Sequence, residues 1–170
     1  KRDKIKIVLL AGPTSSGKTT TARKLEVYLK TRGFKTHSIS TDDYFYNRKD
    51  TPRKVTGEYD FESLRAVDTD LFNKQLLKLL EGERVLLPEY NFVLGEREYN
   101  GRYLQLGDND IIIIEGLHAL NPELTVAINE ENKFKIYISP LTQLNIDNHN
   151  RIHTSDTRRL RRIIRDNKYR

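Results

Sequence analysis

The feature that most constrains the fold is an apolar run that leads directly into a glycine-bounded loop. Residues 5–10 read Ile-Lys-Ile-Val-Leu-Leu, which is typical of a strand covered on both faces in a parallel sheet. Residues 12–19 read Gly-Pro-Thr-Ser-Ser-Gly-Lys-Thr and match G-x-x-x-x-G-K-[ST], a pattern that binds phosphates when it joins a strand to a helix. Because a helical pattern covers 17–32, the sequence predicts a phosphate-binding loop in its required context.

The chemistry expected of this loop follows from its geometry. Glycines let successive backbone N–H groups turn inward toward phosphate oxygens, and the positive end of the following helix adds to that attraction. Lys18 is expected to reach the β- and γ-phosphates, and the Thr19 hydroxyl to ligate Mg²⁺. The predicted nucleotide-binding residues are Gly12, Pro13, Thr14, Ser15, Ser16, Gly17, Lys18, Thr19 and Thr20.

The rest of the chain alternates strand and helix patterns. Further strands are predicted at 35–40, 111–114 and 134–138, and further helices at 68–80, 141–152 and 156–169. This order predicts an α/β fold of the P-loop NTPase type, with a mainly parallel sheet flanked by helices. Residues 84–106 are predicted to form a small β-hairpin insertion, in which the Asn100-Gly101 pair is the turn signal. A length of 170 residues suits one domain, 1–170.

The net charge of +6 resides in one segment of the chain. Residues 151–170 hold eight Lys and Arg against two Asp, while the preceding 150 residues carry 22 basic and 22 acidic side chains. A neutral domain that ends in one basic element argues against nucleic acid as its partner. There is no cysteine, and no apolar run approaches the ~20 residues of a membrane span. We therefore expect a cytoplasmic protein without membrane contact.

Two carboxylates follow predicted strands and fall at the ligand-binding edge of a parallel sheet. Glu115 ends the run of four isoleucines at 111–114, where it could bind Mg²⁺ or serve only as a strand-end charge. Asp42 follows the strand at 35–40 within Thr-Asp-Asp-Tyr. It could take the proton of an acceptor hydroxyl, or it could cap a turn. The residues alone leave both alternatives open.

The C-terminal helix is amphipathic. Leu160, Ile163 and Ile164 recur on one side, and Arg158, Arg161, Arg162 and Arg165 recur on the other. One interpretation is an arginine lid, about 154–170, that closes over a triphosphate. A nucleic-acid contact and a solvated basic face are the alternatives. The phosphate loop in the same domain favours the lid.

Taken together, these residues resemble the uridine kinase family within the phosphoribulokinase and uridine kinase group. Besides the phosphate loop, the resemblance rests on segments at 40–45, 59–62, 88–93, 114–117 and 156–158. It is greatest to the kinase part of longer bacterial uridine kinase-like proteins, whose front half is similar to the N-terminal region of threonyl-tRNA synthetase. The family continues beyond the lid, so the chain is interpreted as a fragment that lacks the C-terminal end.

The resemblance implies a role for each matching residue. It makes Asp42 the catalytic base, places Mg²⁺ among Thr19, Asp42 and Glu115, and gives Lys18, Arg161 and Arg165 catalytic positions at the phosphates. The implied acceptor-binding residues are Asp42, Tyr44, Glu62, Tyr90, Phe92, Arg97 and Arg158. Two positions depart from the family: Glu62 replaces an aspartate near the ribose, and Gly95 replaces a histidine that reads the base.

The function expected from this set is an ATP- or GTP-dependent kinase that phosphorylates the 5′-hydroxyl of a nucleoside such as uridine or cytidine. The alternatives are a kinase of another small hydroxylated metabolite, a regulatory NTPase and an RNA-binding module. Homo-oligomerisation is left open. Because Gly95 has no side chain, we expect a relaxed or altered choice of acceptor.

Overall fold

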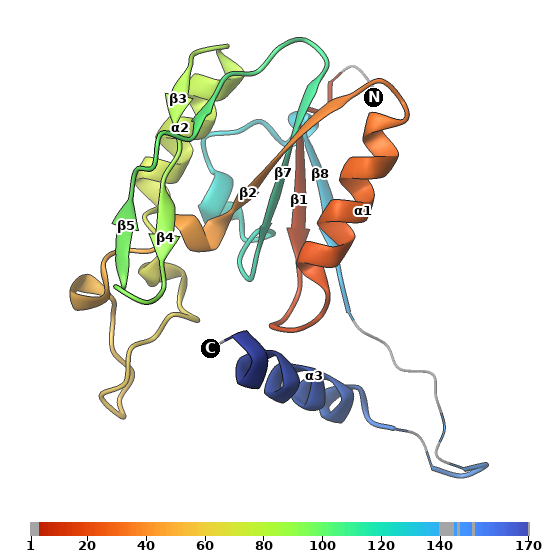
Figure 1. The fold of residues 1–170 in the computed structure, drawn as a ribbon. Coiled ribbons are helices and arrows are strands. Elements are labelled where there is room, and N and C mark those ends of the chain that lie inside the picture. The colour runs from red at the N-terminus through yellow and green to blue at the C-terminus, as the bar shows by residue number, and fades with distance from the viewer. Residues whose placement is uncertain (1–3, 140–144, 146, 151, 170) are drawn as a thin grey trace.

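The core of the molecule is a four-stranded parallel sheet (Figure 1). The computed structural model describes residues 4–139, 145, 147–150 and 152–169. The strand order is β2-β7-β1-β8. These strands are β1 (Ile7–Ala11), β2 (Lys35–Ser40), β7 (Asp110–Gly116) and β8 (Lys133–Tyr137). All of the pairings are parallel, so the carboxyl ends of the four strands share one edge. The predicted fold class and the four predicted strands are confirmed.

Helices cover both faces of this sheet (Figure 1). The helix α1 (Lys18–Lys30) packs through Ala22 and Leu25 on one face, where Ile113 is fully buried. The helix α2 (Thr69–Leu80) packs through Phe72 and Leu76 on the other face. Asp68 caps α2, since its carboxylate accepts a hydrogen bond of 3.0 Å from the N–H of Leu71. A third helix, α3 (Thr154–Tyr169), lies beyond the carboxyl edge of the sheet.

The hairpin insertion forms as two short antiparallel ladders in line. One pairs β3 (Val85–Leu86) with β6 (Tyr103–Leu104), and the other pairs β4 (Glu89–Asn91) with β5 (Glu96–Glu98). The turn therefore lies at 92–95, where the N–H of Gly95 donates to the carbonyl of Asn91 at 2.7 Å. The prediction that Asn100-Gly101 makes the turn is wrong. Gly101 has a positive φ of 76° and interrupts one arm between the two ladders.

The helix predicted at 141–152 is wrong wherever that range is described. Residues 145, 147–150 and 152 are not helical. The Asp147 carboxylate accepts hydrogen bonds of 2.7 Å from the N–H groups of both His149 and Asn150. This local Asx turn competes with helix formation. The remaining residues of 141–152 lie outside the described residues.

Short 3₁₀ helices connect these elements. They are η1 (Thr41–Tyr44), η2 (Arg48–Asp50), η3 (Leu64–Ala66), η4 (Pro122–Thr125) and η5 (Glu130–Asn132). The first three belong to the polar, aromatic-rich connection between β2 and α2. None of the described helices has the length and apolar composition needed to cross a bilayer.

The contact between the end of β7 and η1 generates a stability prediction. A Cβ atom at Gly116 would overlap the Thr41 hydroxyl and lie 2.8 Å from the Thr41 Cβ. We expect Gly116→Ala to lower the free energy of unfolding by about 1–3 kcal/mol, because the buried Thr41 must move. Chemical denaturation would measure the loss.

Gly107→Ala is the matched control. A Cβ atom at Gly107 would lie 3.6 Å from an Asp110 carboxylate oxygen, which is an ordinary contact. Equal stability of the two variants would contradict the proposed overlap.

Candidate active site

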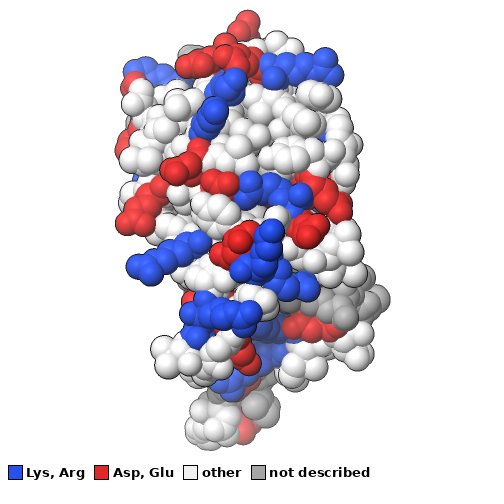
Figure 2. Space-filling view, turned by 90° about the vertical axis from the view of Figure 1, so that its left-hand side faces the viewer, with Lys and Arg blue, Asp and Glu red and all other residues white. Residues whose placement is uncertain are grey.

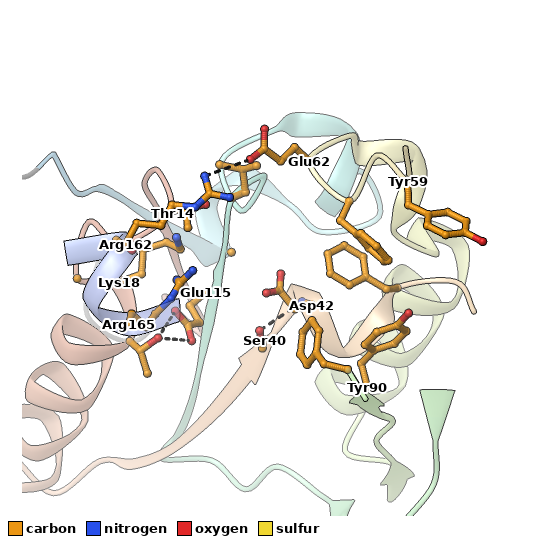
Figure 3. A pocket seen from close by; sticks show the side chains of 18 of the residues that line it. Thr14, Lys18, Ser40, Asp42, Tyr59, Glu62, Tyr90, Glu115, Arg162 and Arg165 are labelled. Carbon is orange, nitrogen blue, oxygen red and sulfur yellow. Dashed lines mark hydrogen bonds and ion pairs between the residues drawn. The ribbon is translucent and has the colours of Figure 1, made fainter. Parts of the chain in front are cut away.

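A cavity of about 940 Å³ opens at the carboxyl edge of the sheet (Figure 3). The phosphate loop forms one end of the cavity, an aromatic cluster forms the other, and α3 borders the phosphate end. Its ionisable lining residues are Lys18, Asp42, Arg48, Lys54, Tyr59, Glu62, Tyr90, Glu115, Arg161, Arg162 and Arg165. The parallel sheet thus places a single cavity across residues that are far apart in the sequence.

The phosphate loop curls tightly between β1 and α1. Ser15 and Gly17 have positive φ angles of 61° and 100°, which turn the backbone back on itself. A Cβ atom at Gly12 would lie 2.5 Å from the Ile138 carbonyl oxygen, so only glycine fits there. Of the predicted nucleotide-binding set, Thr14, Ser15, Gly17, Lys18, Thr19 and Thr20 line the cavity.

Lys18 lies folded over its own loop. Its Nζ donates to the carbonyl oxygens of Gly12 at 2.8 Å and Pro13 at 3.2 Å. Burial lowers the pKa of Lys18, and the nearby negative charges of Glu115 and Asp42 oppose that change. A phosphate group in the loop would offer this ammonium stronger, charge-assisted hydrogen bonds than the two carbonyls do.

Thr19 and Glu115 meet across the end of the sheet. The Thr19 hydroxyl lies 2.9 and 3.1 Å from the two Glu115 carboxylate oxygens. In the described part of the chain, no three His, Cys, Asp or Glu side chains come together as a metal site. Mg²⁺ in nucleotide sites usually takes one or two protein oxygens and completes its shell with phosphates and water. The Thr19 and Glu115 oxygens fit that kind of site.

Adjacent aspartates after β2 face different surroundings. The Asp42 carboxylate points into the cavity between the phosphate loop and the aromatic cluster (Figure 3). Ser40 caps η1 instead, because its hydroxyl accepts from the Asp42 N–H at 3.3 Å. Asp43 accepts from the Tyr90 N–H at 3.4 Å and lies 3.5 Å from Arg102. Burial raises the pKa of Asp43. The Asp42 carboxylate thus faces the cavity, whereas Asp43 contacts the hairpin through Tyr90 and Arg102.

The aromatic cluster encloses the far end of the cavity. Phe45 makes edge-on ring contacts with Phe61 at 5.5 Å and with Tyr90 at 5.6 Å, and Tyr90 contacts Phe92 at 5.1 Å. Phe92 is 49% exposed, whereas Tyr90 is 5% exposed. The Tyr90 hydroxyl is buried and has no hydrogen-bond partner among the described residues. A flat ligand could pack against these rings and bond to that hydroxyl.

Two residues expected at the acceptor lie outside this cavity. Tyr44 is 1% exposed, and its hydroxyl donates to Gln75 at 2.8 Å. Arg97 pairs with Asp68 at 3.0 Å and donates to the backbone carbonyls of Tyr44 and Phe45 at 3.1 and 3.0 Å. The structure does not bring these two predicted acceptor residues into the cavity, because the Tyr44 side chain is packed beneath η1 and the Arg97 guanidinium is held by an ion pair and two carbonyl groups.

The helix α3 presents arginines to the phosphate end. Arg161, Arg162 and Arg165 line the cavity. The Arg161 guanidinium lies close to the phosphate loop, since a Cβ atom at Gly17 would be 3.7 Å from its Nη2. Arg162 lies 4.0 Å from the Glu62 carboxylate. The opposite, apolar side of α3 is exposed. The basic side of α3 therefore faces the phosphate loop.

Four predicted site residues border a smaller neighbouring cavity of about 340 Å³. These residues are Pro13, Thr14, Glu62 and Arg158. Glu62 and Thr14 border both cavities, whereas Arg158 borders only the smaller one. Gly12 and Ser16 are absent from both linings; they shape the turn beneath. The Ser16 side chain is buried, and no described residue bonds to its hydroxyl.

The structure also places residues in the cavity to which the sequence gave no site role. They are Ser40, Phe45, Arg48, Lys54, Tyr59, Phe61, Val93, Gly116 and Leu117. Five of these nine belong to the connection between β2 and α2, which lacks the periodicity that marks helices and strands. The sequence signals available for them were the aromatic content of this connection and, for Phe45, Tyr59 and Phe61, the family-like segments at 40–45 and 59–62.

Comparison with known protein families finds a match over most of the chain. The model of the "Phosphoribulokinase / Uridine kinase family" matches residues 7–170. The chain belongs to this family. The match spans the phosphate loop, the acids, the aromatic cluster and α3 together.

Two uridine kinases among the relatives differ in how much of their length the chain covers. A uridine kinase of Schizosaccharomyces pombe is 34% identical over 123 residues, which cover 71% of this chain and 26% of that protein. A uridine kinase of Bacillus pumilus is 28% identical over 169 residues, which cover 99% of this chain and 71% of that protein. The chain thus spans about a quarter of the fungal relative.

Among solved structures, that of a possible uridine kinase from Bacillus stearothermophilus is similar in fold. It is 26% identical with a TM-score of 0.62, and the match covers 78% of this chain and 70% of that one. The shared fold includes the parallel sheet that carries the phosphate loop.

The Thr19–Glu115 pair generates a prediction about metal dependence. We expect Glu115→Gln to raise the Mg²⁺ concentration needed for half-maximal ATP binding by about 10-fold or more, because a charged oxygen ligand or its close support is lost. Calorimetric titration of ATP at a series of Mg²⁺ concentrations would measure this. Glu123→Gln, on the exposed turn η4, is the control. The same Mg²⁺ dependence in both variants would contradict the assignment.

Proposed function

We propose that this chain is a kinase domain that transfers the γ-phosphoryl group of ATP or GTP to the 5′-hydroxyl of a nucleoside. The observation that carries the proposal is the position of Asp42, between a phosphate loop and an aromatic cluster in one cavity. A kinase requires those three parts in that order: a phosphate donor site, a base and an acceptor site. The uridine kinases among the relatives support a nucleoside as the acceptor.

In this mechanism the protein positions and stabilises charge. The loop N–H groups and Lys18 hold the β- and γ-phosphates. Asp42 accepts the proton of the acceptor hydroxyl as the hydroxyl oxygen attacks the γ-phosphorus. The bond between the γ-phosphorus and the β,γ-bridging oxygen breaks, and the nucleoside diphosphate leaves. Mg²⁺, when bound with the nucleotide beside Thr19 and Glu115, neutralises phosphate charge. Arg161 and Arg165 stabilise the charge on the transferred group from the other side.

The alternatives have less support. Because the basic side of α3 borders the cavity, it suits a lid better than an RNA surface. Figure 2 shows acidic and basic side chains interspersed over one face, with no broad area of a single charge. A kinase of another small alcohol differs from our proposal only in the acceptor.

A panel of acceptors tests the proposal. Uridine, cytidine, adenosine, guanosine and non-nucleoside alcohols would be incubated with ATP or GTP and Mg²⁺, and products identified by mass spectrometry. We expect nucleoside 5′-monophosphates. Lys18→Ala is the inactive control, since it removes the lysine that neutralises the transferred phosphate. If only the non-nucleoside alcohols are phosphorylated, the proposed nucleoside acceptor is wrong. Undiminished turnover by Lys18→Ala would contradict the kinase proposal.

The adjacent aspartates provide a matched test of the base. We expect Asp42→Asn to lower kcat by roughly 100-fold or more with ATP affinity and melting temperature nearly unchanged. Asp43→Asn should instead lower the melting temperature, because it weakens the contacts to Tyr90 and Arg102, and should change kcat by less than about 10-fold. If Asp42→Asn affects stability and leaves kcat intact, Asp42 is structural.

The arrangement of α3 predicts closure on the nucleotide. We expect backbone amides of α3 to exchange hydrogen more slowly when an ATP analogue and Mg²⁺ are added, because phosphates can pair with Arg161 and Arg165. Hydrogen-exchange mass spectrometry would detect the change, with α2 as an internal reference and Lys18→Ala as the control that weakens nucleotide binding. Equal exchange in α3 with and without the analogue would argue against a lid.

A further inference from the structure

The turn at the tip of the hairpin encloses a charged side chain from a distant segment. Arg48 begins η2, and its backbone N–H donates to the Gly95 carbonyl at 2.7 Å. Its Nη2 donates to the Phe92 carbonyl, also at 2.7 Å. Backbone and side chain thus hold Arg48 against the turn between β4 and β5.

Gly95 is the residue that makes room for it. A Cβ atom at Gly95 would lie 2.7 Å from Nε, 2.8 Å from Cζ and 2.9 Å from Cβ of Arg48. These distances are too short for real contacts, so any side chain at position 95 would displace the arginine. Gly95 also has a φ of 74°, which disfavours other residues. The space beside the turn therefore belongs to the Arg48 side chain.

Arg48 lines the aromatic end of the cavity together with Tyr90 and Phe92. A guanidinium has five N–H groups, and one N–H group of Arg48 donates to the Phe92 carbonyl. No carboxylate of the described residues lies within ion-pair distance of it. Burial raises the pKa of Tyr90, and the positive charge of Arg48 opposes that rise.

Glu96 and Arg97, the two polar residues that follow Gly95, do not line this cavity and so cannot bond to a ring bound there. Arg97 is held by Asp68 and by two backbone carbonyls, and Glu96 is exposed on β5 outside the cavity lining. The polar side-chain groups left at the aromatic end are the Arg48 guanidinium, the exposed Lys54 and the hydroxyls of Tyr90 and Tyr59, and the Tyr59 hydroxyl points away from the cavity (Figure 3). Arginine and lysine can only donate hydrogen bonds.

We propose that Arg48 selects the acceptor by donating hydrogen bonds to oxygen atoms on the edge of a ring held by Tyr90 and Phe92. This inference rests on the proposed kinase function and names the part of the cavity that recognises its acceptor. The ligand chemistry is a flat ring with an oxygen acceptor distal to the reacting hydroxyl. Either a ring carbonyl or a ring carboxylate supplies such an oxygen, and adenine has neither.

The test compares acceptors that differ at that edge. Uridine presents carbonyls, 5-carboxyuridine adds a carboxylate, and adenosine has no oxygen on its ring. Arg48→Met keeps much of the side-chain volume and removes every donor. Because a hydrogen bond to a charged donor contributes enough to change affinity by about 10- to 100-fold, we expect kcat/KM for uridine and 5-carboxyuridine to fall by about 30-fold. We expect kcat/KM for adenosine to change by less than about 3-fold, and KM for ATP to stay the same.

Lys49→Met is the matched control, because its neighbouring side chain is exposed and does not line the cavity. It should leave all three values of kcat/KM unchanged. An equal fall for all three acceptors in Arg48→Met would show that Arg48 only clamps the turn, and no fall would show that it does not touch the acceptor. Either outcome overturns the proposal. In the wild type, a preference for 5-carboxyuridine over uridine would identify a carboxylate as the recognised group, and the reverse would identify the carbonyl.

Failure of the kinase proposal is distinguishable from failure of this one. If the wild type phosphorylates no nucleoside, binding of uridine and adenosine would be measured by calorimetry. Uridine binding that weakens about 30-fold in Arg48→Met and stays intact in Lys49→Met supports the role of Arg48 without the reaction. Unchanged binding in Arg48→Met, or no uridine binding by the wild type, overturns it.

Discussion

The register of the parallel sheet is the constraint on which the rest of the site depends. In the ladder between β1 and β7, Leu10 is the partner of Glu115, and in the ladder between β2 and β7, Ser40 is the partner of the same residue. The phosphate loop, Glu115 and the segment that carries Asp42 therefore leave the sheet at one level. Because side chains alternate between faces, a slip of one residue would turn Glu115 away from Thr19. The start of β7 opposes that slip, since a shift would separate the buried Asp110 carboxylate from His37, which lies 2.8 Å away on β2.

Among the described residues, the loops around the aromatic end of the cavity are held in place mainly by polar contacts, without a second hydrophobic core of their own. Arg97 ties the backbone after η1 to the residue that caps α2, and Asp43 ties η1 to the hairpin. Such buried, well-satisfied contacts favour one arrangement of a segment that has little regular structure of its own. They hold Asp42 in the middle of the cavity and the aromatic cluster at its far end, so residues outside the cavity lining still determine its shape.

The charges of the cavity are arranged by function. Six cationic side chains and three carboxylates line it. Glu115 lies beside Thr19, where a metal ion could bind, and Asp42 lies where an acceptor hydroxyl could bind. Glu62 lies near Arg162. Lys18, Arg161, Arg162 and Arg165 gather at the phosphate end, where a triphosphate would neutralise them. Arg48 and Lys54 lie apart from that group, at the end where an acceptor would bind.

The sequence by itself determined the fold class, the phosphate loop, the parallel strands and the amphipathic helix at the C-terminus. These features depend on local patterns: a continuous apolar run, a glycine-bounded loop and apolar residues at helical spacing. It also placed Glu115 and Asp42 at the right edge of the sheet, because strands in a parallel sheet end together. It misplaced the turn of the hairpin, since Asn-Gly favours a turn locally but cannot specify which strands pair.

Only the tertiary structure decided what each polar residue after β2 faces. Asp42 and Asp43 are adjacent residues of the same type, and no local pattern distinguishes them. In the structure the Asp42 carboxylate points into the cavity, whereas the Asp43 carboxylate accepts a hydrogen bond from the Tyr90 N–H. Tyr44 and Arg97 lie outside the cavity, because Tyr44 is buried in the core and Arg97 forms an ion pair with Asp68. Arg48 entered it because Gly95, 47 residues away along the chain, leaves it room. Contacts between distant segments depend on how the loops pack, which no local pattern records.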